Sequence, residues 1–214
     1  MKRRDVLRVL AGATAFPLVD RLPDDWLALG RTVHADRRAE QGAPLRALNE
    51  ETLRLVTAAC QRIIPADETP GAVEAGVPAF IDRVLADWCD TRERERFFEG
   101  LRALDARSRT AHKVAFADAR PEHQIAMLRE LDAELTAWRQ TPPAAPPLPG
   151  VQALPAHGFG MLKFLTIWGY FTSEVGQRDE LGAYPPPTRY DACAQYTPRH
   201  RRASGADAPM GASD

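Results

Sequence analysis

The sequence predicts an all-α fold, a small irregular helical bundle with a long proline-rich loop and an extended C-terminal arm. Apolar residues recur at helical spacing in several segments between residues 49 and 135, and no segment alternates apolar and polar residues as a half-buried strand does. Residues 159–171 are apolar and aromatic almost throughout. The 214 residues are enough for one domain with a modest core.

The first helix of the bundle is expected to begin after Asn49, a favourable N-cap residue, and to end before Pro65. Glu50 and Glu51 stand in its first turn, where the helix dipole favours negative charge. The apolar face of this helix is expected to comprise Leu53, Val56, Cys60 and Ile63.

A second helix is expected to follow a structured loop. Residues 65–78 contain three prolines and two glycines, which is typical of a loop rather than a helix. Pro78 suits the first turn of the second helix. That helix carries the apolar residues Phe80, Ile81, Val84, Leu85 and Trp88.

Two more helices are predicted before residue 141. Thr91 is a candidate cap for the third helix, and Pro121 suits the first turn of the fourth. The third is expected to turn Phe97, Phe98, Leu101 and Leu104 inward. The fourth continues as a stripe of Ile125, Leu128, Leu131 and Leu135.

A proline-rich loop separates these helices from the most apolar segment. Residues 141–155 include six prolines, a density that predicts an extended surface loop. Gly158 and Gly160 then predict a flexible hinge. The segment 159–171 is expected to form a helix with several aromatic rings on one face, and it is too short and too polar at its ends to cross a membrane.

The N-terminus has the layout of a twin-arginine export signal. Arg3, Arg4 and Leu7 precede an uncharged apolar stretch over residues 9–19. Because this route carries proteins already folded, often with cofactor bound, the rest of the chain is expected to hold a cofactor or to travel with a protein that does. Residues 33–35 offer a candidate cleavage site, although the signal could also stay uncleaved.

These features divide the chain into four expected parts. They are a signal segment (1–35), a polar linker (36–48), a helical domain (49–198) and a disordered tail (199–214). The tail is rich in small and polar residues, which is typical of disorder.

Charge and cysteine content narrow the classes of partner. The net charge is −1 and no basic stripe is interleaved with aromatic residues, so we expect no nucleic-acid partner. Three cysteines are an odd number for an oxidising compartment. Cys60 and Cys89 lie on apolar helix faces and are expected to be buried, which leaves Cys193 as the candidate for a disulfide to another chain.

No catalytic or cofactor-binding constellation stands out in the sequence. The five histidines lack the spacing of metal ligands, and no glycine-rich dinucleotide motif follows a strand. We therefore expect no catalytic residue, metal site or cofactor in this chain, and a binding or escort subunit rather than an enzyme.

Two alternative functions stay open. The first is an independent secreted enzyme whose site is assembled from scattered residues such as Asp67, Glu74, Asp82 and His157. The second is a membrane-surface module that uses the 159–171 helix, although Lys163 is its only basic flank.

Two long motifs resemble those of the gluconate 2-dehydrogenase subunit 3 family. Residues 62–82 are similar to its N-terminal motif, and residues 169–176, 180–185 and 189–193 are similar to its C-terminal motif. The resemblance extends from about residue 49 to residue 193. One departure is the proline-rich loop, which is longer than the family needs.

The resemblance implies a non-catalytic small subunit of a periplasmic dehydrogenase for sugars, sugar acids or polyols. In such complexes the large subunit is a flavoprotein of the glucose-methanol-choline type with its own FAD, and a cytochrome c subunit with haem often accepts the electrons. The large subunit commonly lacks a signal and leaves the cell through the twin-arginine translocase bound to the small one. The expected location is therefore the periplasm, with membrane association only through the complex.

The C-terminal motif contains the candidate partner interface. Aromatic side chains are enriched at the centres of interfaces, although the same residues could form an ordinary helix end and core. After three prolines, residues 189–191 could form an arm across a partner or pack on this chain. The candidate interface residues are Trp168, Tyr170, Phe171, Thr172, Ser173, Glu174, Arg189, Tyr190 and Asp191.

The assignment of Cys193 can be tested on the purified complex. Without reductant, electrophoresis is expected to show one band that contains both subunits, because the disulfide would join them covalently. Reduction should separate the band, and Cys193→Ser should abolish it. Two subunits that already run separately without reductant would rule the disulfide out.

Overall fold

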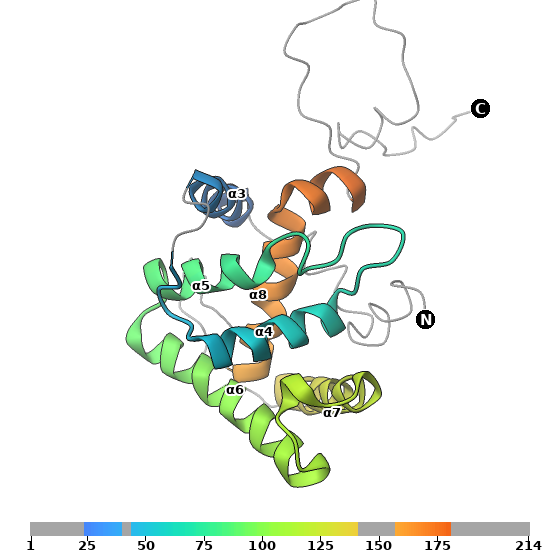
Figure 1. The fold of residues 1–214 in the computed structure, drawn as a ribbon. Helices are drawn as coiled ribbons and strands as arrows, with labels where there is room; N and C mark the ends of the chain where they lie inside the picture. Colours follow the sequence, from blue (N-terminus) through green and yellow to red (C-terminus); the bar gives the residue numbers. More distant parts are fainter. Residues whose placement is uncertain (1–23, 40–43, 141–156, 181–214) are drawn as a thin grey trace, which may run out of the picture.

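Six α-helices and two short helical turns form the part of the chain described by this computed structural model, residues 24–39, 44–140 and 157–180 (Figure 1). No strand occurs within these residues, so the predicted all-α class is confirmed. The elements are α3 (Asp24–Ala39), α4 (Glu50–Ile63), α5 (Val77–Asp87), α6 (Thr91–His112), η2 (Phe116–Asp118), α7 (Pro121–Gln140), α8 (Gly158–Thr172) and η3 (Gly176–Glu180).

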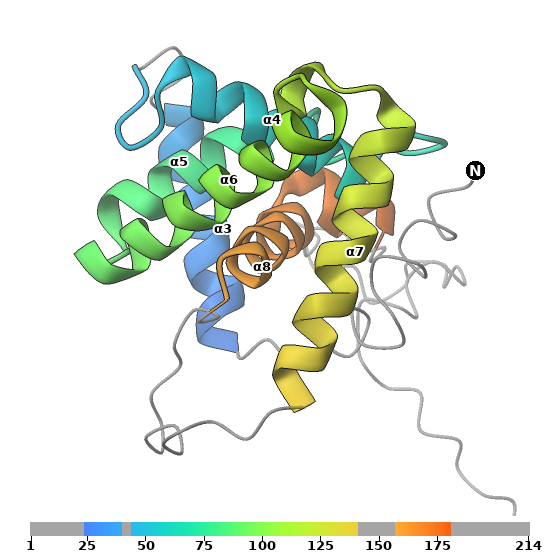
Figure 2. The ribbon, with the colours of Figure 1, turned by 90° about the horizontal axis from the view of Figure 1, so that it is seen from below.

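Helix α8 is the central element of the fold. It contacts each of α3, α4, α5, α6 and α7, and Figure 2 looks nearly along its axis with the other helices arranged around it. Every residue of α8 except Gly158 and Phe164 is buried. A helix that is apolar on all sides is stable in water only when other elements enclose it. The sequence predicted one inward face, whereas the structure buries nearly the whole circumference.

The boundaries of α4 follow from its predicted cap and stop. The Asn49 side chain accepts a hydrogen bond from the Thr52 backbone N–H at 2.8 Å, and the Thr52 hydroxyl accepts one from the Asn49 N–H at 2.9 Å. These two bonds form a capping box. The helix ends at Ile63, two residues before Pro65, as predicted.

The next two helices, α5 and α6, differ in the residues that start them. Gly76 precedes α5 with φ +76°, a left-handed conformation that favours glycine, and Pro78 stands in the first turn as predicted. Helix α6 is capped by Asp90 and not by Thr91, because the Asp90 carboxylate accepts the Glu93 backbone N–H at 2.8 Å. Thr91 is the first residue of the helix itself.

Helix α7 begins at Pro121 as predicted, but its buried face is slightly rotated from the expected stripe. Leu128, Leu131 and Leu135 are buried, whereas Ile125 is only half-buried. Gln124 takes the inward position instead, where its amide donates to the Phe116 carbonyl at 2.8 Å. A polar residue that satisfies a buried backbone carbonyl therefore belongs to the core face of this helix.

Gly158, the first residue of α8, forms a tight helix crossing, and the predicted flexible hinge at Gly158 and Gly160 is wrong because both lie within the helix. Gly158 lies against Gly100 of α6, so closely that a Cβ on Gly158 would come within 2.7 Å of the Gly100 Cα. A Cβ on Gly100 would approach the Gly158 backbone to 2.8 Å. Two glycines facing each other let the backbones of α6 and α8 meet directly.

Helix α3 changes the expected division of the N-terminal part. Residues 24–35 of the expected signal and 36–39 of the expected linker form one helix that packs on α5 and α8. Val33 is buried in the core, and Trp26 and Leu29 pack against it. This spacing of i, i+3 and i+7 is that of an amphipathic helix.

Several predictions concern residues outside the described part. These are the twin-arginine residues Arg3, Arg4 and Leu7, the proline-rich loop 141–155 and the tail 199–214. Among the described helices, none is both long enough and apolar enough to span a membrane.

The Gly100–Gly158 crossing can be tested with Gly100→Ala. Helix propensity alone would raise the free energy of unfolding by about 1 kcal/mol. Because the new methyl group meets the Gly158 backbone, we expect the substitution to lower it instead, by about 1–3 kcal/mol. Urea unfolding followed by circular dichroism measures the change.

The exposed Ala103 on the same helix provides the control. Ala103→Gly should lower the free energy of unfolding by about 1 kcal/mol through propensity alone. A Gly100→Ala protein more stable than the unmodified chain would show that α6 and α8 do not cross this closely.

Candidate functional site

The two motif segments meet where α5 packs against the C-terminal half of α8. The Tyr170 hydroxyl donates to the Pro70 carbonyl at 3.1 Å and so joins α8 to the loop before α5. Phe80 of α5 lies against Gly169, where a Cβ would come within 2.6 Å of its ring. The Phe80 ring also meets the Trp168 ring edge-on, with centroids 5.0 Å apart. We call these five residues the motif core.

The loop between α4 and α5 is held at both of its ends. The Ala72 backbone N–H donates to the Ile64 carbonyl at 2.9 Å, and the Glu74 carboxylate accepts the Gly71 N–H at 3.0 Å. Gly71 is required by packing, because a Cβ there would come within 2.6 Å of the Ala66 nitrogen. The prolines and glycines of this motif therefore have a structural explanation.

Helix α3 adds His34 to the motif core. The His34 Nε2 lies 2.7 Å from the Gly169 carbonyl oxygen, and its ring stacks on Phe80 with centroids 4.7 Å apart. Burial lowers the pKa of His34 to about 4, and the nearby Arg37 and Arg38 act in the same direction. The neutral ring therefore donates its Nε2–H to the carbonyl at neutral pH.

Trp26, near the start of α3, packs on the same face of α8. The Trp168 indole N–H donates to the Trp26 carbonyl at 2.8 Å. The Trp26 ring packs edge-on against the rings of Phe164 and Trp168, at 5.3 and 4.9 Å between centroids. Buried indole N–H groups need a partner, and here the backbone of α3 supplies it.

The candidate enzyme residues serve separate structural roles. Asp82 is buried and accepts three consecutive backbone N–H groups, from Arg46 at 3.0 Å, Ala47 at 2.9 Å and Leu48 at 2.8 Å. These bonds satisfy the buried carboxylate oxygens and attach the segment before α4 to α5.

The other three candidates are also engaged locally. The Asp67 side chain accepts from the Thr69 N–H, and Glu74 holds Gly71 as described above. His157 caps α8 by accepting the Gly160 N–H at 3.3 Å. Burial lowers the pKa of His157. Within the described residues, no group of three or more His, Cys, Asp or Glu side chains is arranged to hold a metal ion.

One protein family matches the segments that build the motif core. A sequence model of the family described as gluconate 2-dehydrogenase subunit 3 matches residues 50–187, which include the loop, α5 and α8. The chain belongs to this family. Its description denotes an accessory subunit of a multi-subunit dehydrogenase. Neither the curated proteins nor the solved structures contain a significant match.

In this subunit 3 chain, most of the expected partner interface is its own core. Five of these residues are buried within this chain and contribute to its own packing: Trp168, Tyr170, Phe171, Thr172 and Ser173. Their positions match the interpretation of these residues as a helix end and core, and their use at a partner interface stays a prediction. The Ser173 hydroxyl, for example, donates to the Tyr170 carbonyl at 2.6 Å and ends α8.

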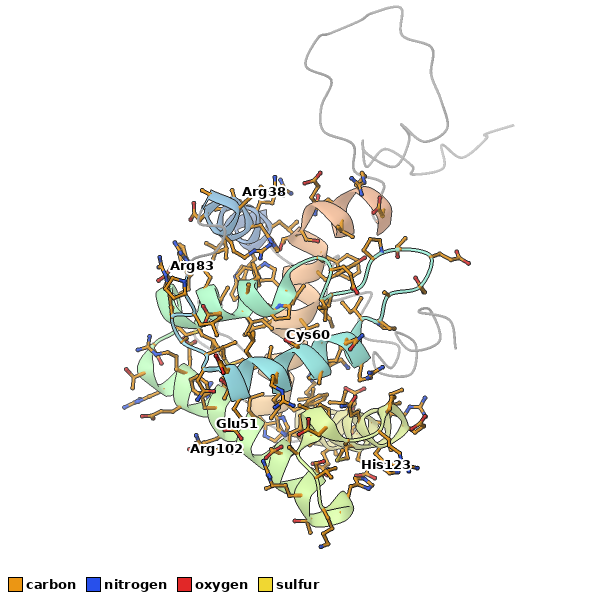
Figure 3. All side chains as sticks on the ribbon, in the orientation of Figure 1. Arg38, Glu51, Cys60, Arg83, Arg102 and His123 are labelled. Atoms are coloured by element: carbon orange, nitrogen blue, oxygen red, sulfur yellow. The ribbon has the colours of Figure 1, made fainter. Side chains whose placement is uncertain are left out.

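Of the expected interface residues, Glu174 alone lies exposed within the described part of the chain. It pairs with Arg38 of α3 at 3.1 Å, and Figure 3 labels Arg38 at that edge of the molecule. Residues 189–191 and Cys193 lie outside the described residues.

The cysteines of the described part are buried thiols, as predicted. Cys60 and Cys89 are unpaired, and burial raises the pKa of each to about 12. Figure 3 labels Cys60 on α4, where its sulfur lies 3.4 Å from the Thr166 hydroxyl. Such thiols are poor nucleophiles because the thiolate form is disfavoured.

Sequence reasoning missed the buried ion pair between α7 and α8. The Lys163 ammonium lies 2.5 Å from the Asp132 carboxylate, and both side chains are largely removed from solvent. Burial lowers the pKa of Lys163, while the bond to Asp132 opposes that shift. A single lysine within an otherwise apolar helix was the available signal, since a fully enclosed helix must pair such a charge.

A surface groove lies between α4, α6 and η2. It has a volume of about 1120 Å³ and a lining that includes Leu55 and Leu101. Figure 3 labels Glu51 and Arg102 among its lining residues. Glu51 already pairs with Arg109 at 3.7 Å. Two of the opposite charges at the rim of the groove are therefore already paired with each other.

The burial of His34 predicts a pH-dependent stability. Above pH 6.5 the ring is neutral in both the folded and the unfolded chain. As the pH falls from about 6.5 to 4, the unfolded chain binds a proton that the folded chain does not, so the free energy of unfolding falls. A shift of this size is worth up to about 3 kcal/mol.

His34→Gln keeps an N–H donor for the Gly169 carbonyl but does not titrate. Urea unfolding at pH 7, 6 and 5 should therefore show a shallower loss of stability in the variant than in the unmodified chain. All other titrating groups are common to both proteins, so the difference isolates His34. Equal slopes would contradict its burial as a neutral ring.

Proposed function

We propose that this chain is the non-catalytic small subunit of an exported, FAD-dependent dehydrogenase of the glucose-methanol-choline type, acting on sugars, sugar acids or polyols. It supplies the twin-arginine export signal and stabilises the catalytic large subunit. Family membership supports the accessory role. The chemistry then belongs to the partner, which carries FAD, and a cytochrome c subunit with haem accepts the electrons where one is present.

The observation that carries the proposal is how the family motifs are used. Phe80, Gly169 and Tyr170 hold α5 and its preceding loop against α8 instead of lining an open site. A motif used for packing suits a subunit that must present a defined shape to a partner. The scattered residues of the alternative enzyme are engaged in separate caps and loops, and no observation favours that function over the accessory one.

Export would proceed through Arg3, Arg4 and Leu7. The twin-arginine route accepts folded cargo, so a large subunit that lacks a signal could leave the cell bound to this chain. The helical body is well suited to that task, because its core closes around α8 without a second chain. The location of the complex is then the periplasm.

Contact with the large subunit would involve residues that are not buried in the helical core. Glu174 is exposed just after the end of α8. The C-terminal arm with Arg189, Tyr190 and Asp191, and the thiol of Cys193, remain candidates for the same contact.

The escort role can be tested with the double substitution Arg3→Lys and Arg4→Lys. We expect the flavoprotein to be lost from the periplasm and retained in the cytoplasm, because its export depends on this signal in trans. Cell fractionation, followed by FAD fluorescence and immunoblotting of the large subunit, measures its distribution.

A matched control makes the same chemical change at two exposed positions. Arg31→Lys together with Arg92→Lys should leave export unchanged, since both side chains lie on the surface of the folded body. Continued delivery of the flavoprotein to the periplasm by the Arg3→Lys, Arg4→Lys chain would refute the escort function, provided that the subunits still co-purify.

A further inference from the structure

We propose that helix α3 is a permanent part of the mature subunit, and that export processing leaves every peptide bond from Asp24 to Ala39 intact. The inference rests on the proposed export of the chain. Cleavage after Ala35, the expected site, would then not occur. The helix that begins at Asp24 is retained because it forms part of the core.

Helix α3 covers one face of the motif core. It packs on both α5 and α8, and Figure 1 shows it alongside them at one edge of the molecule. Its His34 ring lies on Phe80 and bonds to the Gly169 carbonyl, while its Trp26 carbonyl accepts the Trp168 indole N–H. Without α3, the indole N–H and the carbonyl would lose these partners, and two large aromatic rings would lose their cover.

The backbone of α3 is fitted to this position. Gly30 faces Thr172, and a Cβ on Gly30 would come within 2.6 Å of the Thr172 side chain. Nearer the other end of the helix, the Arg37 guanidinium lies directly over Gly76, the glycine that precedes α5. Two close approaches that depend on glycine, at separate points along one helix, indicate a specific docking site.

The bond after Ala35 is poorly placed for a protease. A processing enzyme needs an extended segment whose small residues enter its pockets, whereas residues 33–35 lie within a continuous helix. Val33, at the third position before that bond, is 1% exposed. Because twin-arginine cargo folds before it crosses the membrane, the protease would meet α3 already docked.

The first test uses the complete complex. Intact-mass spectrometry and N-terminal sequencing of the small subunit from the periplasm should show a chain that begins at or before Asp24. An N-terminus at Asp36, or at any other residue after Asp24, would overturn the inference. A chain found only in the cytoplasm would instead contradict the proposed export, and the second test then decides the inference alone.

The second test asks whether α3 is docked in the purified full-length chain. Limited trypsin digestion with mass readout reports cleavage at Arg31, Arg37 and Arg38. We expect these bonds to be protected in the unmodified chain and exposed in Gly30→Ala, because the added methyl group meets Thr172. Rapid cleavage of the unmodified chain within α3 would overturn the inference.

Two further variants keep this result interpretable if Gly30→Ala folds poorly. Ala28→Leu enlarges an exposed position of the same helix and should keep the protection. Thr172→Gly combined with Gly30→Ala removes all the Thr172 side-chain atoms that the new methyl group would meet, including its Cβ, and should restore it. Equal protection in Gly30→Ala and in the unmodified chain would show that α3 does not occupy this site.

Discussion

The fold depends on enclosing α8, a helix that is apolar on nearly every side. One helix packed against it would leave most of its surface in water, so five helices surround it. Close approach is achieved with glycines where the backbones or side chains meet, as at Gly100 with Gly158, at Gly169 with Phe80 and at Gly30 with Thr172. These contacts hold α6, α5 and α3 close against α8.

The buried polar groups make this apolar packing specific for one arrangement of the helices. Asp82 binds the backbone before α4, His34 binds the Gly169 carbonyl, and Lys163 pairs with Asp132 across α7 and α8. Each group is costly to bury alone, so each favours the single arrangement in which its partner is present. The family motifs supply much of this core, which explains why a chain assigned to a dehydrogenase subunit shows structural rather than catalytic use of its motif residues.

The sequence predicted the elements from α4 to α7 well because their limits are local. Asn49, Pro78 and Pro121 act within one turn, and the residues that they cap or start are adjacent in the chain. Sequence-based prediction was less successful where the deciding contacts join residues that are far apart in the chain. The glycines at the start of α8 could equally form a hinge, and the aromatic residues at its end could equally form an interface, since the sequence pattern of a core helix is the same. Only the packing of α3 and α6 against them distinguishes these possibilities.

Two links connect α4 and α5: the loop between them and the hydrogen bonds of Asp82. The loop 64–76 joins the helices covalently, while the Asp82 carboxylate joins α5 to the segment that leads into α4. The loop is anchored near Ile64 and Ala72, and its tip at 66–68 is exposed. The geometry of the two helices is therefore uncoupled from the length of that tip. A tag inserted at the exposed Glu68 is therefore expected to leave the core in place.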